Sequence, residues 1–522
     1  MATVLPVALR NSAVLLAGVG SLVILMGTGA AWLVTAHDFP WRRMVSWALL
    51  LPLAFPTYII AYAYLDLLHP IGPIQSAIRY VLGYESPQQL RLPDIRSIAG
   101  CIFLLSFVLY PYVYVTTRAM FLMQAASFID VSRTLGVSRK AVFWCVALPL
   151  ARPAIAVGAG LALMETLNDI GASEFLGVRT VTVSIYSTWI NRTDLPGAAQ
   201  IALFMLVFVT ALLGIERWGR QNQRYSNSTL RHAPLLPRRL PLVQGLLALC
   251  LCLIPIVIGF LAPLSYLIMA AAKRVQFDGV SWSYVASVVN TISFALVATL
   301  ITLLAGLIVT YAGRVRPGPI PKFCLRSAAL GYAMPGTVVA IGVLFPLAAL
   351  DQWIDAASTA LFGRGPGLLL IGSGAALIYA YAVRFLAIPV GSIESGLSRI
   401  SGSLDSAARN LGETAGGTLR HIHLPILKPA LAAAGVLLFV DCVKELPATL
   451  LLRPLNFETL ATALYAEAAR GTYEDGSLYA LTIVLIGIAP LVLLSKMGLP
   501  ELPSASPHIA MPDLPVQAAR TG

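Results

Sequence analysis

Charged residues are scarce in this chain of 522 residues. Asp, Glu, Lys and Arg together make up 11% of it, whereas an ordinary soluble protein carries about 25%. Hydrophobic residues make up 58%, and the mean hydropathy is +0.80. There is too little polar surface here to cover a water-soluble domain of this size. The composition predicts an all-α polytopic membrane protein.

Motifs for catalysis and for metal binding are also missing. The dipeptide Gly-Lys never occurs, so the chain has no G-x4-G-K-[ST] loop to hold nucleotide phosphates. His421 and His423 stand two residues apart, a spacing that points the two rings away from each other on a helix. The six cysteines lie mostly in or beside apolar runs and are interpreted as buried structural thiols. We therefore expect no enzyme activity, no cofactor and no metal site.

The chain is basic, with 36 Lys and Arg against 24 Asp and Glu. Such a balance is compatible with nucleic-acid binding, but membrane proteins collect Lys and Arg in their cytoplasmic loops for another reason, the positive-inside rule. We expect a lipid bilayer and no nucleic acid as the partner of these charges.

Apolar stretches of about 20 residues, long enough to cross a bilayer, occur eleven times. The first could in principle be a signal peptide, but its apolar run is longer than such peptides have and its only positive flank is Arg10. The predicted spans lie near 12–35, 46–68, 98–117, 150–170, 198–216, 243–271, 289–313, 328–350, 367–389, 426–446 and 477–497.

One polar stretch occurs twice at a constant offset of 276 residues, as from Arg133 to Arg409. The first copy reads D-V-S-R-T-L-G-V-S-R-K-A-V-F-W-C-V-A-L-P and the second S-A-A-R-N-L-G-E-T-A-G-G-T-L-R-H-I-H-L-P. Each predicts a short polar helix, a glycine in a left-handed C-cap, a Ser or Thr capping a second helix, and a proline that starts a span.

The second copy resembles the cytoplasmic loop of permease subunits of binding-protein-dependent ABC importers, whose pattern is E-A-A-x3-G-x9-I-x-L-P. Ser406 stands in place of the Glu, with Asp405 one position earlier. In the first copy Asp130 replaces the Glu, and Val146 replaces the Ile. The resemblance implies that both loops dock into two copies of a separate ATPase subunit. The implied docking residues are Asp130, Arg133, Leu135, Gly136, Ser138, Leu148, Pro149, Ala407, Ala408, Arg409, Leu411, Gly412, Thr414, Ile422, Leu424 and Pro425.

The repeat extends beyond these loops, since Asn11 and Pro56 match Asn290 and Pro335 at an offset of 279. Five spans therefore recur, and the unpaired stretch 243–271 returns the second set to the orientation of the first. The sequence predicts two parallel-related five-helix permease cores plus one extra spanning helix, which the resemblance identifies with the MetI-like permease fold. The predicted parts are a first half (1–216), a basic cytoplasmic linker (217–242), a second half (243–497) and a disordered tail (498–522).

The basic residues favour placing both repeated loops in the cytoplasm. With that orientation, 20 Lys and Arg lie in cytoplasmic connections and 11 on the opposite side, and the amino terminus lies outside. Arg384 is counted among the cytoplasmic residues. The chain is expected in the inner membrane of a bacterium, as a multi-pass protein.

The span that follows each loop carries ionisable groups, which are costly at membrane depth unless they are paired or line a wet cavity. Glu165 and Asp169 lie one helical turn apart, and so do Asp441 and Glu445, so each pair is expected on one helix face. Two interpretations are compatible: the groups line a translocation path and its outer gate, or Lys444 simply pairs with Asp441. The candidate path residues are Glu165, Asn168, Asp169, Glu174, Asp441, Lys444, Glu445 and Arg453.

Two longer stretches, N-D-I-G-A-S-E-F-L-G-V and K-E-L-P-A-T-L-L-L-R-P, resemble the fused permeases for ferric iron. Thiamine and aminophosphonate importers share that architecture and remain alternatives. The resemblance implies a periplasmic binding protein that delivers the ligand. An ion-coupled secondary transporter with two parallel halves is the alternative from another class, and a channel or a membrane scaffold is less favoured. Tyr62, Tyr64, Tyr110, Tyr112 and Tyr114 could be iron ligands, but we interpret them as an aromatic belt at the membrane interface.

Overall fold

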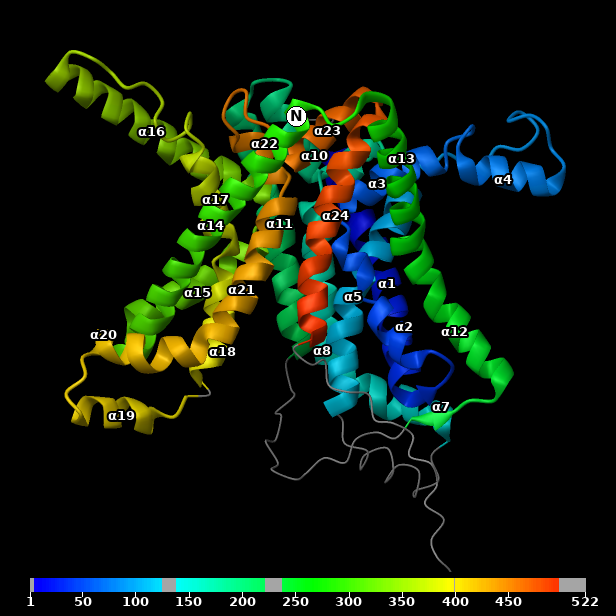
Figure 1. The fold of residues 1–522 in the computed structure, drawn as a ribbon, viewed down its shortest axis with the longest axis horizontal. Coiled ribbons are helices and arrows are strands. Elements are labelled where there is room, and N and C mark those ends of the chain that lie inside the picture. Colours follow the sequence, from blue (N-terminus) through cyan, green and yellow to red (C-terminus); the bar gives the residue numbers. More distant parts are fainter. Residues whose placement is uncertain (1–3, 124–137, 221–236, 399, 497–522) are drawn as a thin grey trace, which may run out of the picture.

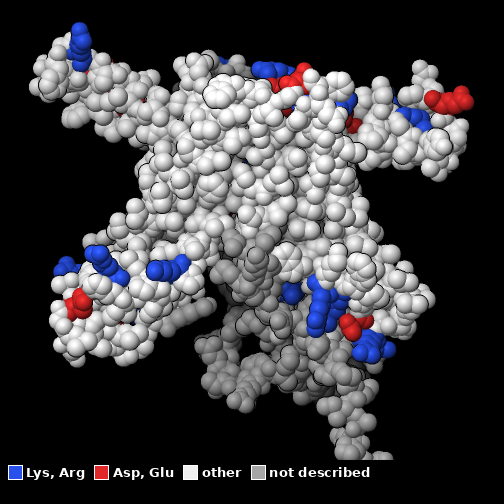
Figure 2. Space-filling view, viewed as in Figure 1, with Lys and Arg blue, Asp and Glu red and all other residues white. Residues whose placement is uncertain are grey.

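The computed structural model describes the chain except residues 1–3, 124–137, 221–236, 399 and 497–522. Almost all of it is helical, and Figure 1 shows the long helices side by side in one bundle. Eight helices are long and apolar enough to span a membrane among the described residues, or ten if each of two bent pairs is one span. Figure 2 shows charge gathered at the two ends of the molecule, with an almost uncharged band between them.

The first half runs from α1 to α11. Its elements are α1 (Val4–Ala36), β1 (His37–Asp38), α2 (Arg42–Ala48), η1 (Leu51–Ala54), α3 (Thr57–Leu67), α4 (Pro73–Leu82), α5 (Ile98–Met123), α7 (Arg139–Val142), η2 (Phe143–Ala147), α8 (Leu148–Asn168), α9 (Gly171–Phe175), α10 (Val181–Ile190) and α11 (Leu195–Arg220).

The second half begins after β2 (Arg238–Arg239), a two-residue strand that pairs in parallel with β1. Its elements are α12 (Leu242–Ile256), η3 (Val257–Leu261), α13 (Ala262–Asp278), α14 (Trp282–Val315), α15 (Pro319–Ala333), α16 (Gly336–Phe362), α17 (Ala375–Phe385), α18 (Ala387–Ser398), α19 (Gly402–Asn410), α20 (Ala415–Thr418), η4 (Leu419–His423), α21 (Leu424–Lys444), α22 (Pro447–Leu452), α23 (Leu460–Arg470) and α24 (Tyr473–Lys496).

The internal repeat reappears as matching hydrogen bonds. Asn11 Nδ2 donates to the Arg179 carbonyl over 3.2 Å, and Asn290 Nδ2 donates to the Glu458 carbonyl over 3.0 Å. The hydroxyl oxygens of Ser12 and Thr291 likewise accept from the amides of Val181 and Leu460. A π-helix also precedes the long helix after each repeated loop. In the first half η2 precedes α8 and in the second half η4 precedes α21, and the two π-helices are 276 residues apart. The two halves are therefore built on one local plan.

Each half packs against the other through its last helix. α11 of the first half contacts α16 of the second, and α24 of the second half contacts η1 and α3 of the first. Because α11 matches α24 and the α3 region matches α16 in the repeat, this is one contact made twice. The arrangement closes a single bundle around the junction between the halves.

Close helix packing inside the first half depends on glycine. A Cβ at Gly158 of α8 would lie 2.7 Å from the Tyr112 carbonyl of α5, and one at Gly27 of α1 would lie 2.8 Å from the Tyr110 carbonyl. Small residues allow such backbone approach in membranes, where van der Waals packing drives helix association. α5 is thereby held between α1 and α8.

Several predicted boundaries are wrong. The spans predicted at 46–68 and 328–350 are interrupted before Pro56 and Pro335, and the first bends by 93°. The span predicted at 367–389 begins only at Ala375, because residues 363–374 form an apolar connection rather than a helix. Hydropathy alone does not separate apolar turns from apolar helices.

Two predictions about side chains are also corrected. Tyr62, Tyr64, Tyr110 and Tyr114 are buried among the helices, not placed in an interfacial belt. The hydroxyls of Tyr110 and Tyr114 donate to the carbonyls of Leu49 and Ser46, where α2 ends and η1 begins. Of the six cysteines only Cys101, Cys252 and Cys442 are buried, whereas the other three are exposed.

Candidate functional site

A similar turn with a buried carboxylate, here called the acidic turn, follows α8 in the first half and α21 in the second. In the first half, Asp169 comes directly after α8 and accepts from the Ser173 amide over 2.7 Å and the Ser173 hydroxyl over 2.8 Å. In the second half, Glu445 follows α21 and accepts from the Thr449 amide over 3.0 Å and the Thr449 hydroxyl over 2.8 Å. Each carboxylate stands one residue before the N-cap of the short helix that follows, α9 or α22, and accepts from an amide of its first turn.

The two acidic turns differ in their remaining partner. Asp169 accepts from the Thr57 hydroxyl over 2.7 Å, whereas Glu445 pairs with the Arg384 guanidinium over 2.5 Å. Both carboxylates are buried. A buried charge is tolerated only with such compensation. The first turn therefore relies on neutral donors and the second on an ion pair.

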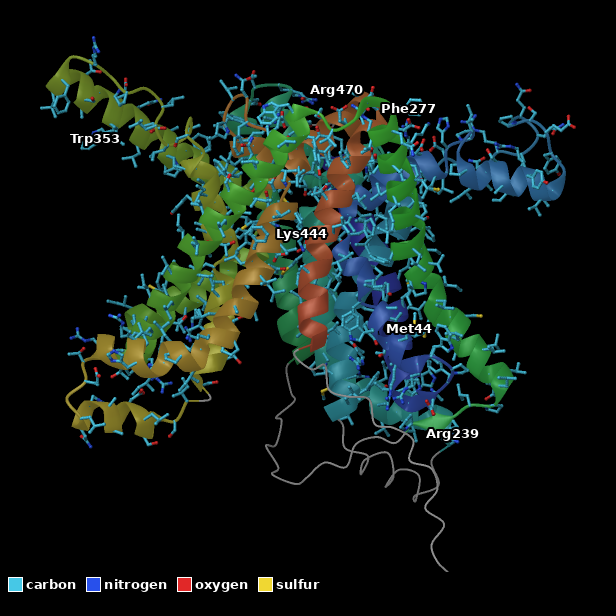
Figure 3. The ribbon with its side chains drawn as sticks, in the orientation of Figure 1. Met44, Arg239, Phe277, Trp353, Lys444 and Arg470 are labelled. Carbon is cyan, nitrogen blue, oxygen red and sulfur yellow. The ribbon has the colours of Figure 1, made fainter. Side chains whose placement is uncertain are left out.

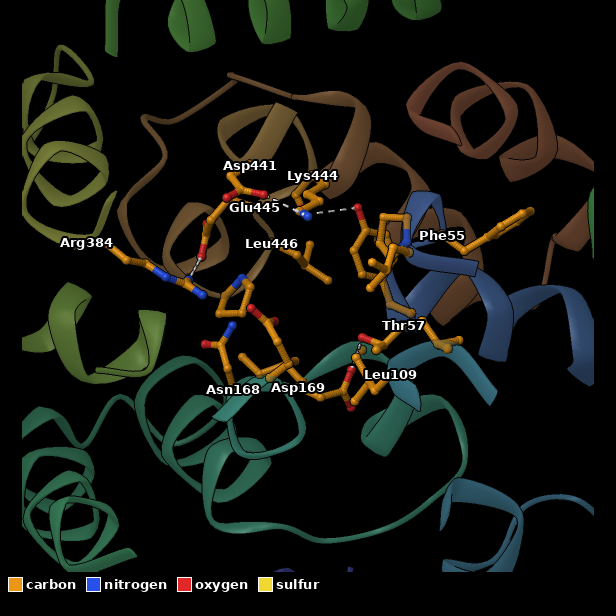
Figure 4. Close-up of a pocket in the computed structure, with 18 of the residues that line it drawn as sticks. Phe55, Thr57, Leu109, Asn168, Asp169, Arg384, Asp441, Lys444, Glu445 and Leu446 are labelled. Carbon is orange, nitrogen blue, oxygen red and sulfur yellow. Dashed lines mark hydrogen bonds and ion pairs between the residues drawn. The ribbon is translucent and has the colours of Figure 1, made fainter. Parts of the chain in front are cut away.

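The turns meet at the junction of the halves. The Tyr58 hydroxyl of α3 donates to the Lys444 carbonyl over 3.3 Å, and the Gly336 amide of α16 donates to the Asn168 side chain over 2.8 Å. Both bonds join one half to the other. Figure 4 shows Asn168 and Asp169 facing Asp441, Lys444 and Glu445 across the gap.

A cavity of about 80 Å³ lies between these turns, large enough to hold water. Its wall combines four carboxylates with only two cationic side chains, Arg384 and Lys444. Lys444 Nζ pairs with Asp441 over 2.7 Å. Within the described part of the chain Glu165 makes no hydrogen bond or ion pair. The polar lining residues are Thr57, Tyr58, Tyr112, Glu165, Asn168, Asp169, Tyr332, Arg384, Asp441, Lys444 and Glu445.

Six of the eight candidate path residues line this cavity, and the predicted Lys444–Asp441 pair is present. The prediction that each acidic pair shares a helix face is wrong in detail. Both helices end one residue earlier, so Asp169 and Glu445 are C-cap residues with extended backbone, and their carboxylates bond forward to the next short helix. Their role in a path stays a prediction.

Glu174 and Arg453 do not line the cavity. The Glu174 carboxylate of α9 accepts from the Tyr465 hydroxyl of α23, and Arg453 pairs with Glu458. The Glu174 contact also joins the two halves, at the end of the bundle where Figure 1 shows α23. Any gate role of Glu174 and Arg453 is therefore separate from the cavity.

Arg384 is the functional candidate that sequence reasoning misplaced. The sequence predicts Arg384 in a cytoplasmic connection, but the residue is buried on α17 against Glu445. A lone arginine in the apolar run A-A-L-I-Y-A-Y-A-V-R-F was the available signal, because an intramembrane charge needs a partner. Thr57, Tyr58, Tyr112 and Tyr332 carried no comparable signal.

The second repeated loop has the predicted local structure. α19 ends before Gly412, which has a left-handed φ of 84°, and Thr414 then caps α20 by accepting from the Gly417 amide over 3.1 Å. Leu424 and Pro425 begin α21. Leu411 is 85% exposed, whereas Ala408 is buried and Ala407 and Arg409 are exposed. The loop thus presents an apolar tip to its surroundings.

The first loop is described only in part. Asp130, Arg133, Leu135 and Gly136 lie outside the described residues. Ser138 begins the described part, and its hydroxyl accepts from the Ala141 amide over 3.4 Å. Leu148 and Pro149 begin α8. Figure 1 places α7 at the same end of the bundle as α19 and α20, opposite the amino terminus.

An anchor in the second loop went unnoticed in the sequence. Asp405 of α19 accepts from Arg314 of α14 at 2.9 and 3.0 Å and lies 2.7 Å from His423 Nε2. His421 instead pairs with Glu413 over 3.1 Å. The two histidines therefore diverge. Among the described residues no group of three or more His, Cys, Asp or Glu side chains could hold a metal ion.

Comparison with known proteins relates the chain to transport permeases. Residues 23–224 match the family described as "Binding-protein-dependent transport system inner membrane component". The chain is similar to the Fe(3+)-transport system permease protein FbpB 2 of Haemophilus influenzae, with 23% identity over 94% of this chain and 89% of that protein. It is 26% identical to the putative ferric transport system permease protein FbpB 1 of the same species over 62% of this chain and 51% of that one. The putative 2-aminoethylphosphonate transport system permease protein PhnV of Salmonella typhimurium is 28% identical over 41% and 74% of the respective chains.

Proposed function

Because this chain belongs to the binding-protein-dependent transport family, as an inner-membrane permease of an ABC importer, we propose that it carries ferric iron. One observation carries the proposal: the similarity to a ferric permease runs along 94% of this chain and 89% of that protein. The aminophosphonate relative matches only 41% of this chain.

The charge of the cavity agrees with a cationic cargo. Four carboxylates line the cavity with two cationic side chains, and Glu165 makes no hydrogen bond or ion pair among the described residues. Carboxylate oxygens are the donors that hard metal cations prefer. A phosphonate would instead meet more carboxylate than cation in this cavity. 2-Aminoethylphosphonate remains the second candidate because of the relative that is named for it.

The two cytoplasmic loops supply the proposed connection to a motor. Two copies of a separate ATPase subunit dock on the loops around Arg133–Ser138 and Arg409–Thr414 and draw them together when ATP binds. The α19 anchor transmits this movement, since Asp405 ties the loop to α14 through Arg314. The halves then separate at the acidic turns. Hydrolysis lets them close again, and the ligand leaves inward.

A periplasmic binding protein delivers the ligand at the other end of the bundle. The proposed contact surface comprises the outer connections around 171–197 and 447–476. These contain α10 and α23, which Figure 1 shows at the end opposite the repeated loops. In this mechanism the two halves that move are residues 1–216 and 243–497, and residues 217–242 are the linker that joins them.

Uptake measurements test the cargo. Cells with and without this gene are given radiolabelled ferric iron, 2-aminoethylphosphonate and thiamine, and the deletion is complemented with the wild-type chain. We expect loss of ferric iron uptake alone, restored by the wild-type chain. Unchanged iron uptake with loss of aminophosphonate or thiamine uptake would reject ferric iron and keep the importer.

Glu165→Gln separates cargo contact from structure. It removes the unpaired carboxylate, so we expect lower iron uptake with normal membrane insertion. Asp441→Asn is the comparison, because it breaks the ion pair with Lys444 and so disturbs the cavity wall itself. Normal uptake in Glu165→Gln would remove Glu165 from the path.

A further inference from the structure

Each half carries a helical arm that leaves the bundle at its outer end. The first arm is α4, and the second is the carboxyl-terminal part of α16, residues 350–362. Figure 1 shows them projecting sideways on opposite flanks, at the end remote from α7 and α19. Each ends at a glycine with left-handed φ, 75° at Gly83 and 70° at Gly363. The arms thus occupy equivalent places in the repeat.

The first arm has its polar side chains inside and its apolar side chains outside. Gln75 is only 2% exposed and bonds to the Leu68 carbonyl and, through its side-chain oxygen, to the Leu92 amide. Arg79, one turn later, is also buried. By contrast Tyr80 is 87% and Val81 80% exposed. The connection after α4 is therefore held by the polar face of the helix.

The second arm repeats this inverted pattern with different residues. Asp351 is fully buried and accepts from three consecutive amides of the returning connection, at Leu369, Leu370 and Ile371, over 2.8 to 3.1 Å. Asp355 accepts from the Gly367 amide over 2.8 Å. The apolar side chains again face outward, and Figure 3 shows Trp353 on this arm, clear of the bundle. Those more than 70% exposed are Trp353, Leu361 and Phe362.

A helix with buried polar and exposed apolar residues is unfavourable in water. Contiguous exposed apolar patches mark sites of protein or membrane contact. Figure 2 shows the arms at the edge of the uncharged band, with few charged side chains on their surfaces. Helices that lie in the membrane interface immerse an apolar face at the boundary between headgroups and acyl chains, and Trp and Tyr favour that depth. Both arms carry such a ring, Tyr80 and Trp353.

We propose that the two arms lie flat in the outer leaflet and bind the lipid surface, one on each flank. Their sideways direction follows the plane of the membrane rather than the axis of the bundle. Much of each polar face is occupied by the arm's own returning connection, through Gln75 in the first arm and through Asp351 and Asp355 in the second. The arms hold the outer rim of each half at a fixed depth in the bilayer.

Fluorescence in phospholipid nanodiscs tests this placement. Cys145, Cys250 and Cys324, the exposed native cysteines, are replaced by Ser, and the environment-sensitive dye NBD is attached at Val81→Cys or Leu361→Cys. We expect blue-shifted emission, quenching by lipids spin-labelled near the headgroup, and no quenching by aqueous iodide. Glu85→Cys and Arg364→Cys, exposed polar positions just beyond each arm, are the matched controls and should be quenched by iodide.

Two results would overturn the proposal. Iodide quenching at positions 81 and 361 equal to that of the controls would place the arms in water. Protection from iodide that arises only when the periplasmic binding protein is added would make the arms a protein-docking surface instead. All labelled side chains are exposed, so none of these substitutions removes a packing contact.

Discussion

Asp405 is predicted to fix the docking loop of the second half, and its replacement by Asn should release that loop. The carboxylate contacts Arg314 at 2.9 and 3.0 Å and His423 at 2.7 Å. Arg314 also donates to the carbonyls of Leu397 and Ile400, so it stays in place without Asp405. The substitution therefore detaches α19 from α14 rather than disordering α14.

The size of the effect follows from the two contacts. A hydrogen bond to a charged group contributes about 1.5–3 kcal/mol when it is shielded. The Asp405 side chain is 24% exposed and that of Arg314 18%, so solvent screening reduces the sum. We expect the attachment of α19 to weaken by about 2 kcal/mol, a change of about 30-fold in the ratio of attached to detached loop.

The assay is hydrogen exchange at the amides of α19, together with ligand-stimulated ATP hydrolysis by the assembled transporter. Asp405→Asn should speed exchange in α19 and lower stimulated hydrolysis while basal hydrolysis persists. Glu413→Gln is the control, because it breaks another carboxylate–histidine pair in the same loop, with His421, that does not reach α14. Since that pair is largely exposed, its loss should cost less than about 1 kcal/mol.

The reasoning is refuted if the Asp405→Asn variant shows wild-type hydrogen exchange in α19 and wild-type stimulated ATP hydrolysis. It is also refuted if Glu413→Gln has an equal effect on both. In the first case the contacts with Arg314 and His423 do not hold the loop. In the second case the loop responds to any lost charge, and the anchor has no special place.

Three further predictions concern the acidic turns, the loop glycine and the first strand. Glu445→Gln leaves Arg384 buried without its ion-pair partner and should destabilise the protein by about 3 kcal/mol or more. Asp169→Asn should cost about 1–2 kcal/mol, because the partners of Asp169 are neutral. Thermal unfolding in detergent compares the two variants, and equal losses of stability would contradict the difference between the two acidic turns. Gly412→Ala puts a side chain on a residue with left-handed φ, which should cost about 1–2 kcal/mol and impair transport while membrane insertion stays intact. Gly416→Ala in α20 is the control and should leave transport unchanged. Uptake assays with both variants check this. Burial, with Arg238 and Arg42 nearby, lowers the pKa of His37 below its ordinary 6.5, so folding favours the neutral ring. The pairing of β1 with β2 should therefore be fully stable above pH 6.5 and weaken as the pH falls below it; hydrogen exchange near Arg238 measures this, and His37→Gln should abolish the dependence.

The sequence predicted those features that depend on local chemistry. The glycine after α19, the cap at Thr414 and the proline at the start of α21 each follow from one residue type at one position. The offset of 276 residues also puts Asp169 and Glu445 at equivalent positions of the repeat. Matching residues at a constant offset carry that information without any tertiary structure.

The remaining features depend on contacts between distant segments. Arg384 and Glu445 are 61 residues apart, and Tyr58 and Lys444 are 386 apart, so no local pattern joins them. The arms lie between the predicted spans, and their inverted burial depends on hydrogen bonds to the connections that follow them, as from Gln75 to Leu92 and from Asp355 to Gly367. Asp405 was seen only as a displaced motif residue, since its partner Arg314 lies on another helix.

Crosslinking at the exposed tip of the second loop tests the central claim most directly. Leu411 is 85% exposed, so Leu411→Cys, with Cys145, Cys250 and Cys324 replaced by Ser, offers a thiol at that tip. In native membranes a bifunctional thiol reagent should join it to an ATP-hydrolysing subunit, and a membrane-impermeant reagent added to intact cells should leave it unlabelled. Labelling from outside, or the absence of any ATPase among the crosslinked products, would contradict an importer driven through this loop.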